Sequence, residues 1–329
     1  MAVQSLPRTA RTEPRFAILP RGRMARSEAK WFYFFISPWI IGYLIFTLGP
    51  IIFSGYLSFT RFNLSDPPVW VGLQNYRLLL QDSIFWKSLQ VSAYYTFLSV
   101  PLGIVFSLLL ALLLNQKVPF MGVFRTLFYL PSIMPAVAST LLFVWILNSQ
   151  FGILNYALRS LLGSNGVIPL GLNGAKWLED PKWVIPSFTI MSLWGVGGGM
   201  LIYLSGLQGI PTQLYEAATI DGAGRLQRFW HVTVPMISPV ILFTFITGVI
   251  GSFQVFTQAW VVNGGSGAPA YSSMFYVLYL FVNAFRRYRM GTAAAQAWLL
   301  FIVILVLTIL FLRASKRFVY YEDEGGGRF

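Results

Sequence analysis

Side chains that could perform covalent or metal chemistry are scarce in this sequence. It has one histidine, His231, and no cysteine, which excludes disulfides, thiol catalysis and cysteine metal sites. All 11 acidic residues lie outside the long apolar runs, so none forms a carboxylate pair within them. The sequence also lacks a GxxxxGK[ST] phosphate-binding loop. The chemistry that remains is non-covalent recognition by hydroxyl, amide and small apolar groups.

Polar side chains recur along one face of an apolar segment near residue 250. They belong to a stripe of residues that share one side of a helix, because the spacing is i, i+3, i+4, i+7 and i+11. The stripe comprises Thr247, Ile250, Gly251, Gln254 and Gln258. Threonine and glutamine are costly toward lipid, so this stripe should face protein or a water-filled path. Both residue types donate and accept hydrogen bonds, which suits recognition of hydroxyl groups. The stripe predicts either a solute path or polar contacts between helices.

A second candidate is the glycine-rich stretch 193–200. Gly195 and Gly199 have the GxxxG spacing that lets two helices approach closely. The stretch therefore predicts close packing, or alternatively open space for a ligand beside Trp194.

A polar stretch between two apolar runs is the most unusual segment of the chain. It comprises Tyr215, Glu216, Ala217, Ala218, Thr219, Ile220, Asp221, Gly222, Ala223 and Gly224, and Pro235 follows it. Thr212 is a candidate helix N-cap, and the alanines favour a slim helix. The glycines tolerate left-handed backbone and should end that helix. The segment predicts a helix–turn–helix that can enter a groove of a partner, or alternatively an ordinary amphipathic loop.

These positions require a membrane-embedded helical scaffold. Of the 329 residues 56% are hydrophobic and only 11% are charged, whereas a soluble domain has about a quarter charged. Runs free of charged residues and of histidine are long enough to cross a bilayer at 31–58, 89–114, 126–147, 183–207, 236–257 and 293–312. None alternates with the period of two that a barrel strand needs. We therefore expect an all-α membrane protein with six transmembrane helices.

The charge pattern predicts an orientation. With the N-terminus inside, Lys and Arg are denser in the inner segments than in the longer outer ones. Arg286, Arg287 and Arg289 are an outer exception. The first apolar run is too long for a signal peptide and has no cleavage site after it. We expect both termini to be cytoplasmic, and this distribution of the net charge of +13 argues against nucleic-acid binding.

The chain is expected to divide along these runs. The predicted parts are a basic cytoplasmic tail 1–30, a first transmembrane helix 31–58, a periplasmic segment 59–88, a core of five transmembrane helices 89–312 with a loop at 208–235, and a cytoplasmic tail 313–329. Pro131 and Pro135 should kink the third span because each removes a backbone donor. The aromatic-rich run 271–285 is too short for a seventh span and predicts a re-entrant or interfacial segment.

Several motifs in order resemble one family of membrane proteins. The segment from Tyr215 to Pro235 is similar to the EAA loop of ATP-binding-cassette (ABC) importer permeases, the element that docks into a cytoplasmic ATPase. Segments 71–76, 124–131 and 285–291 resemble those of the carbohydrate-uptake permeases for maltose and glycerol phosphate. The similarity covers nearly everything from residue 32 onward.

The resemblance implies a type I importer permease of a prokaryotic inner membrane. Such a chain is not an enzyme and holds no cofactor or metal, since partner subunits bind ATP and Mg. The implied partners are a second related permease in a heterodimer, two ATPase subunits, an extracytoplasmic solute-binding protein and membrane lipid, with no nucleic acid.

The resemblance also implies two sets of site residues. The ATPase-docking set is Tyr215, Glu216, Ala217, Ala218, Asp221, Gly222, Ala223, Gly224 and Pro235. The substrate-pathway set is Trp194, Gly195, Gly198, Thr247, Ile250, Gly251 and Gln254. The ligand residues of the family are of other types here, so substrate contacts do not carry over. A sugar, oligosaccharide or polyol is the expected substrate, with a glycerophosphodiester as competitor.

Two other classes of protein fit the sequence less well. An ion-coupled carrier, or a facilitator of a small polar solute, is the main alternative, but spans without charges count against an acid relay. A membrane-bound enzyme would need a catalytic constellation that this sequence lacks.

Overall fold

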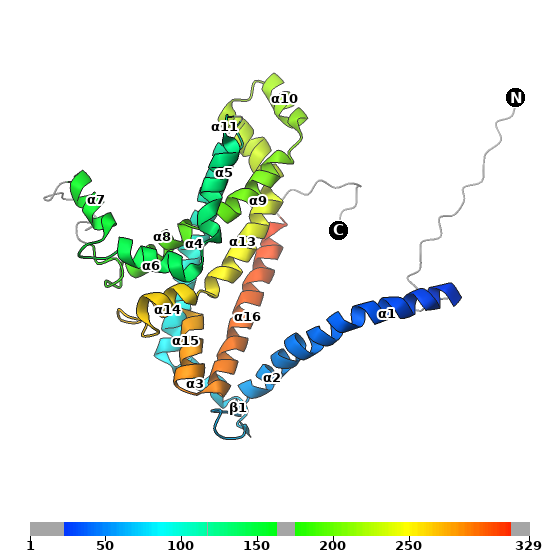
Figure 1. The fold of residues 1–329 in the computed structure, drawn as a ribbon, viewed down its shortest axis with the longest axis vertical. Coiled ribbons are helices and arrows are strands. Elements are labelled where there is room, and N and C mark those ends of the chain that lie inside the picture. The colour runs from blue at the N-terminus through cyan, green and yellow to red at the C-terminus, as the bar shows by residue number, and fades with distance from the viewer. Residues whose placement is uncertain (1–22, 117, 163–174, 317–329) are drawn as a thin grey trace. The chain divides into compact units, whose positions relative to one another are not determined.

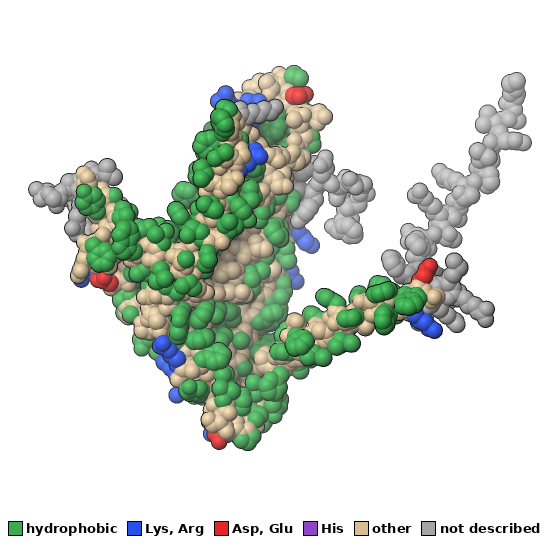
Figure 2. All heavy atoms as spheres, viewed as in Figure 1, with side chains coloured by type: hydrophobic (Ala, Val, Ile, Leu, Met, Phe, Trp, Pro, Cys, Tyr) green, Lys and Arg blue, Asp and Glu red, His purple; other side chains and the backbone are tan. Residues whose placement is uncertain are grey.

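The computed structural model describes residues 23–116, 118–162 and 175–316, and it separates into two units. Unit 1 is Met1–Tyr56 and unit 2 is Leu57–Phe329. Helices predominate in both (Figure 1). On the face shown in Figure 2, hydrophobic side chains cover most of unit 2 and Lys and Arg are sparse, as expected for a surface in contact with lipid. Most of the predicted tails, 1–30 and 313–329, lies outside the described residues.

Four helices are long and apolar enough to cross a membrane, and two bent helix pairs raise the number to six if each pair forms one span. These six elements coincide with the predicted runs. The first is Ser27–Ser58, which includes most of α1 (Arg23–Tyr43), the π-helical turn η1 (Leu44–Leu48) and α2 (Gly49–Ser58). The π turn ends just before Pro50, which has no N–H to offer to a regular helical ladder.

A hairpin and a short helix follow the first span. Strands β1 (Thr60–Arg61) and β2 (Val69–Trp70) pair antiparallel, with Thr60 opposite Trp70. Helix α3 (Gln74–Gln81) then leads to α4 (Ser83–Leu114), a span that begins earlier than the predicted residue 89. Asp82 caps α4, because its side chain accepts a hydrogen bond from the backbone N–H of Ile84.

The third and fourth spans are bent, and only the first bend was predicted. Helix α5 (Met121–Tyr129), the 3₁₀ turn η2 (Leu130–Ile133) and α6 (Ala136–Ile146) turn by 94° around Pro131 and Pro135, which confirms the predicted kink. Helices α8 (Val184–Leu193) and α9 (Gly197–Gln208) meet at 52° across the glycine-rich stretch, a bend that was not predicted from the sequence. Between the two bent spans lies α7 (Ile153–Leu162).

The loop after α9 contains α10 (Thr212–Ile220), α11 (Arg225–Arg228), the π turn η3 (Phe229–Thr233) and α12 (Val234–Met236). The fifth span is α13 (Ser238–Phe253) followed by α14 (Thr257–Asn263). The last elements are α15 (Tyr276–Phe281), the π turn η4 (Val282–Arg286) and α16 (Met290–Ser315). In unit 2, α10 and α11 lie at one end and α3 and β1 at the other (Figure 1).

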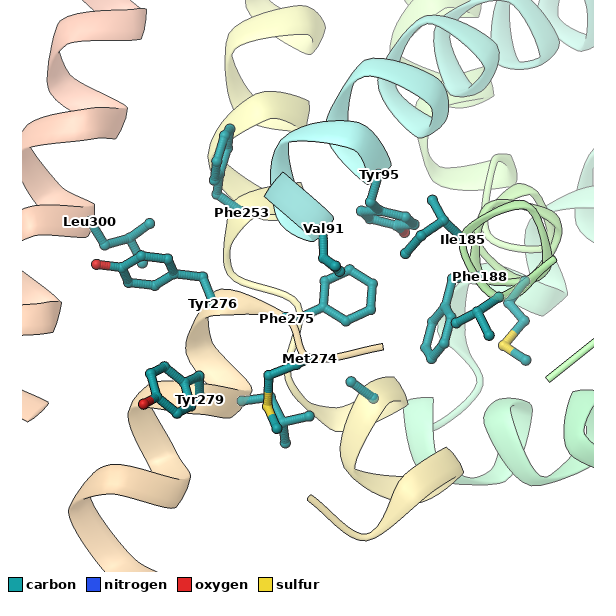
Figure 3. Packing of buried hydrophobic residues seen from close by; sticks show 14 of the residues in the cluster. Val91, Tyr95, Ile185, Phe188, Phe253, Met274, Phe275, Tyr276, Tyr279 and Leu300 are labelled. Atoms are coloured by element: carbon teal, nitrogen blue, oxygen red, sulfur yellow. The ribbon is translucent and has the colours of Figure 1, made fainter. Parts of the chain in front are cut away.

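Helix α4 is central to unit 2, since α8, α9, α13 and α15 all contact it. The main hydrophobic cluster surrounds Phe275, whose ring meets those of Tyr95 and Phe188 edge to face at 5.2 and 5.1 Å (Figure 3). Helix α15 is buried in this cluster, with Tyr276 and Tyr279 at most 1% exposed. The predicted run 271–285 is not among the helices long enough to cross a membrane, and its middle is buried in protein while Tyr271 and Phe285 near its ends are exposed.

Buried polar side chains join the helices of this core. Ser252 Oγ of α13 donates to Thr96 Oγ1 of α4 at 2.8 Å, and Tyr276 N donates to Ser92 Oγ of α4 at 2.9 Å. Hydroxyl contacts of this kind hold helices together where lipid offers no hydrogen-bond partner.

Candidate functional site

The polar stretch forms the predicted helix–turn–helix at one end of unit 2. No residue of α10 is buried, so the helix projects away from the rest of the fold. Thr212 is the first helical residue and not the cap, because Pro211 with its extended backbone occupies the N-cap position. Assignment of a helix start from sequence alone is commonly off by one residue.

The turn between α10 and α11 is a Schellman motif. Ala223 N donates to Ala218 O at 2.9 Å and Gly222 N donates to Thr219 O at 3.0 Å. The motif needs a left-handed residue, and Gly222 has φ +79°. Gly224 then caps α11, its N–H donating to Gln227 Oε1 at 2.8 Å. The two glycines that sequence reasoning selected thus set the direction of the turn.

Hydrogen bonds between side chains join α10 to α11 and to η3, the segments that follow it. The hydroxyl groups of Tyr215 and Thr233 are 2.9 Å apart, and Arg228 Nη1 donates to Thr219 Oγ1 at 2.9 Å. Tyr215 thus points inward, and Pro235 lies in α12, the next element after Thr233. The remaining predicted docking residues are exposed or half-buried, and Ala218, Asp221, Gly222 and Ala223 line a hollow of about 300 Å³ with His231.

Two apolar side chains stand out on this loop. Ile220 at the end of α10 is 87% exposed and Leu226 at the start of α11 is 72% exposed. Single exposed leucines need no explanation, but exposed apolar side chains on an otherwise polar projection are the kind of feature that a partner protein covers. Sequence reasoning missed both residues, although Ile220 stands within the polar stretch.

A second candidate site is a cavity of about 480 Å³ among α4, α8, α9, α13 and α14. Three of the predicted pathway residues line it, namely Gly195, Thr247 and Gly251, and so does Gln258 of the polar stripe. Hydroxyl residues and glycines recur in the lining, together with one amide, Gln258, and several aliphatic side chains, and none of the described lining residues carries a charge. This surface can exchange hydrogen bonds with an uncharged polar solute.

The other predicted pathway residues do not line this cavity. Trp194 packs edge to face on Phe143 at 5.8 Å, and Gly198 lies beside Ser132. Ile250 and Gln254 are also absent from the lining. The stripe is interrupted because α13 ends at Phe253, with Gln254 as its C-cap, so that Gln258 projects from the separate helix α14.

Several lining residues were not predicted, and they come chiefly from α4. Ser99, Gly103 and Ser107 recur at i, i+4 and i+8, and this small polar stripe in the second span was a readable signal. On the opposite side, Tyr203 of α9 is hydrogen-bonded through its hydroxyl to Thr244 of α13. The cavity is thus built from three spans, whereas the prediction used two.

Comparison with known proteins places the chain. Residues 103–319 match the family model described as binding-protein-dependent transport system inner membrane component. A probable ABC transporter permease protein, YesP of Bacillus subtilis, is 35% identical, covering 93% of this chain and 97% of YesP. The lactose transport system permease protein LacF of Rhizobium radiobacter is 34% identical, covering 89% of this chain and 98% of LacF.

The fold agrees with a solved structure. A bacterial alginate ABC transporter, crystallised in complex with an alginate pentasaccharide-bound periplasmic protein, contains a chain with a TM-score of 0.75. It is 23% identical, and the match covers 90% of this chain and 98% of that one. The chain therefore belongs to the family of binding-protein-dependent transport inner membrane components. It is a multi-pass ABC importer permease of the type I fold, a transport subunit and not an enzyme.

Proposed function

We propose that this permease carries a sugar or oligosaccharide across the membrane through the cavity beside α4. The observation that carries the proposal is a lining in which hydroxyl groups and the amide of Gln258 alternate with glycines and aliphatic side chains, without a charged residue. A neutral, hydroxyl-rich solute matches such a surface, whereas a phosphodiester would call for Arg or Lys. Sugar transport by relatives supports the assignment, since LacF is named for lactose and another relative, AraP of Bacillus subtilis, for arabinooligosaccharides.

The second part of the proposal concerns the energy source. We infer that α10 and α11 dock into an ATPase, which binds ATP and Mg, and that the exposed Ile220 and Leu226 enter its groove. The residues from Tyr215 to Gly224 form this contact, with Pro235 ending the loop. Helix α16 runs from the end of unit 2 that bears α3 toward the end that bears α10 (Figure 1), which supports a cytoplasmic C-terminus on the docking side.

The proposed assembly contains a second related permease, two ATPase subunits and an extracytoplasmic solute-binding protein. The predicted pathway residues Trp194, Gly198, Ile250 and Gln254 lie outside the cavity. Within this proposal they remain candidates for contacts that the second permease completes.

Replacement of Glu216 by lysine tests the docking. Glu216 is exposed on α10, so Glu216→Lys should leave membrane insertion intact while it abolishes uptake and the stimulation of ATP hydrolysis by solute and binding protein. Glu28→Lys, a charge reversal on exposed α1, is the matched control and should behave as wild type. Normal uptake and ATPase stimulation in Glu216→Lys would refute the docking site.

Replacement of Gln258 tests the solute path. Gln258→Leu removes one hydrogen-bonding side chain from the cavity and should raise the KM for the transported solute about fivefold, as expected for a net loss of ~1 kcal/mol. Gln208→Leu, at the exposed end of α9, is the control. Equal KM values in both variants would contradict the role of the cavity, and uptake driven by an ion gradient without ATP would favour the carrier alternative.

A further inference from the structure

A cavity of about 740 Å³ lies at the end of unit 2 opposite to α10. The loop between β1 and β2, α3, α15, η4 and the start of α16 enclose it. Arg61, Arg287 and Arg289 line it together with polar side chains that include Asn63, Gln74 and Thr292. Neither the docking loop nor the transport cavity uses any of these residues.

The charges of this cavity are unbalanced. Its one lining carboxylate, Asp82, is already engaged, since it accepts hydrogen bonds from Ile84 N and from the hydroxyl of Tyr279. Burial and the neighbouring Asp82 carboxylate raise the pKa of Tyr279, which keeps this hydroxyl protonated as a donor. Arg287 donates to Asn283 Oδ1 at 3.1 Å and to the hydroxyl of Tyr279 at 3.2 Å.

The other two arginines have no such partner. The guanidinium groups of Arg61 and Arg289 make no hydrogen bond or ion pair with any residue that the structure describes. An arginine fork without an acceptor, facing a cavity with an excess of positive charge, is suited to bind an anion.

The position of the cavity indicates which class of anion is available to bind in it. Arg61 follows closely on α2, the end of the first span, and Arg289 is the N-cap of α16, the start of the last span. Both guanidinium groups therefore stand at the border between hydrocarbon and lipid headgroups. Exposed aromatic side chains of the kind enriched at this border surround them, with Trp70 61% exposed and Tyr288 57% exposed.

We propose that this cavity holds the headgroup of an anionic phospholipid. Arg61 and Arg289 donate charge-assisted hydrogen bonds to the phosphate oxygens, while Gln74 and the accepting hydroxyl oxygen of Thr292 hydrogen-bond the polar remainder of the headgroup. The volume is that of a pocket for a small organic molecule and exceeds what a single ion requires. This lipid site is independent of the imported solute and of the ATPase contact proposed above.

Bound-lipid analysis tests the proposal. The full chain, in the complex with which it purifies from native membranes, is placed in nanodiscs of phosphatidylglycerol and phosphatidylcholine, and the retained lipids are quantified by native mass spectrometry. Each arginine near a membrane surface strengthens the attraction to anionic lipid about fivefold. The two factors multiply, so the Arg61→Gln/Arg289→Gln variant should retain phosphatidylglycerol roughly 25-fold less selectively than wild type. Arg77→Gln is the control, because Arg77 lies on α3 but does not line the cavity, and it should leave the retention of phosphatidylglycerol unchanged.

Three results would overturn the proposal. One is equal phosphatidylglycerol retention in wild type and the double variant. A second is that inorganic phosphate displaces the bound lipid as effectively as short-chain phosphatidylglycerol does, which would indicate a site for a free anion. A third is retained lipid with lost capture of the solute-binding protein, which indicates a protein contact. An unchanged thermal unfolding temperature shows that the double variant is folded, and Arg61→Lys/Arg289→Lys should recover much of the selectivity because it keeps both charges.

Discussion

At the residue scale, the docking loop depends on one backbone conformation. Gly222 takes the left-handed position of the Schellman motif and so turns the chain from α10 into α11. Ile220, just before the turn, and Leu226, just after it, are exposed on either side. The angle between two short helices thus decides whether both apolar side chains present a common surface to the partner.

We predict that Gly222→Ala weakens coupling more than it weakens folding. A Cβ at φ +79° costs about 1 kcal/mol, which the local turn bears because a Cβ there would meet no neighbouring atom within 4 Å. Solute-stimulated ATPase activity of the assembled transporter should fall severalfold while membrane insertion is unchanged. Gly122→Ala, at a similarly open position within α5, is the control. Wild-type stimulation in Gly222→Ala would show that the turn geometry is not limiting.

At the element scale, the breaks in the helices position the transport cavity. The bend between α8 and α9 brings the glycine-rich stretch against two other elements. A Cβ on Gly197 would lie 2.1 Å from the carbonyl oxygen of Phe128, and a Cβ on Gly199 would lie 2.6 Å from Ser107 Oγ of α4. Close approach of helices was predicted for Gly195 and Gly199, and Gly199 makes it, whereas Gly195 has no such contact.

Substitution of Gly197 should therefore be structural in its effect. Gly197→Ala forces the backbone of Phe128 away from α9, so we expect a marked fall in the amount of folded protein and in its thermal unfolding temperature. Gly209→Ala, whose Cβ would make ordinary contacts at 3.5 Å and beyond, should express and unfold as wild type. Similar unfolding temperatures for the two variants would mean that the α5–α9 contact is looser than described.

At the scale of the whole molecule, unit 2 carries three surfaces with different chemistry. The polar docking loop is at one end, the arginine-lined cavity is at the other, and the uncharged cavity lies among the spans. In the proposed function, an ATPase docked at one end and a solute path among the helices require that partner subunits drive changes in how the helices pack.

Purification from native membranes in mild detergent is the direct test of the proposed assembly. Mass spectrometry should find a second six-span permease and an ATPase, with two ATPase copies for each permease pair. The Ile220→Asp variant should lose the ATPase and keep the second permease, because Ile220 lies on the loop that carries α10 and α11 and not on a membrane span. A wild-type chain that purifies alone and transports without ATP would contradict the proposed complex.

Local properties of the sequence were sufficient to predict the spans and the helix–turn–helix formed by α10 and α11. The length of an apolar run and the exclusion of charges from lipid depend on the bilayer rather than on distant contacts, so the six spans were readable. The turn at Gly222 and the kink at Pro131 were readable for the same reason, because each follows from the backbone chemistry of its own residue.

Only the tertiary structure decided which polar residues share a cavity. Periodicity assumes an unbroken helix, but α13 ends at Phe253, and the break before α9 leaves Trp194 against Phe143. Ser99 and Ser107 meet Thr247 only because α4 packs between α9 and α13, a contact between segments far apart in the chain. The pairing of Arg61 with Arg289 across one cavity depends likewise on the hairpin folding back onto the start of α16. Such meetings are set by packing, which no single segment encodes.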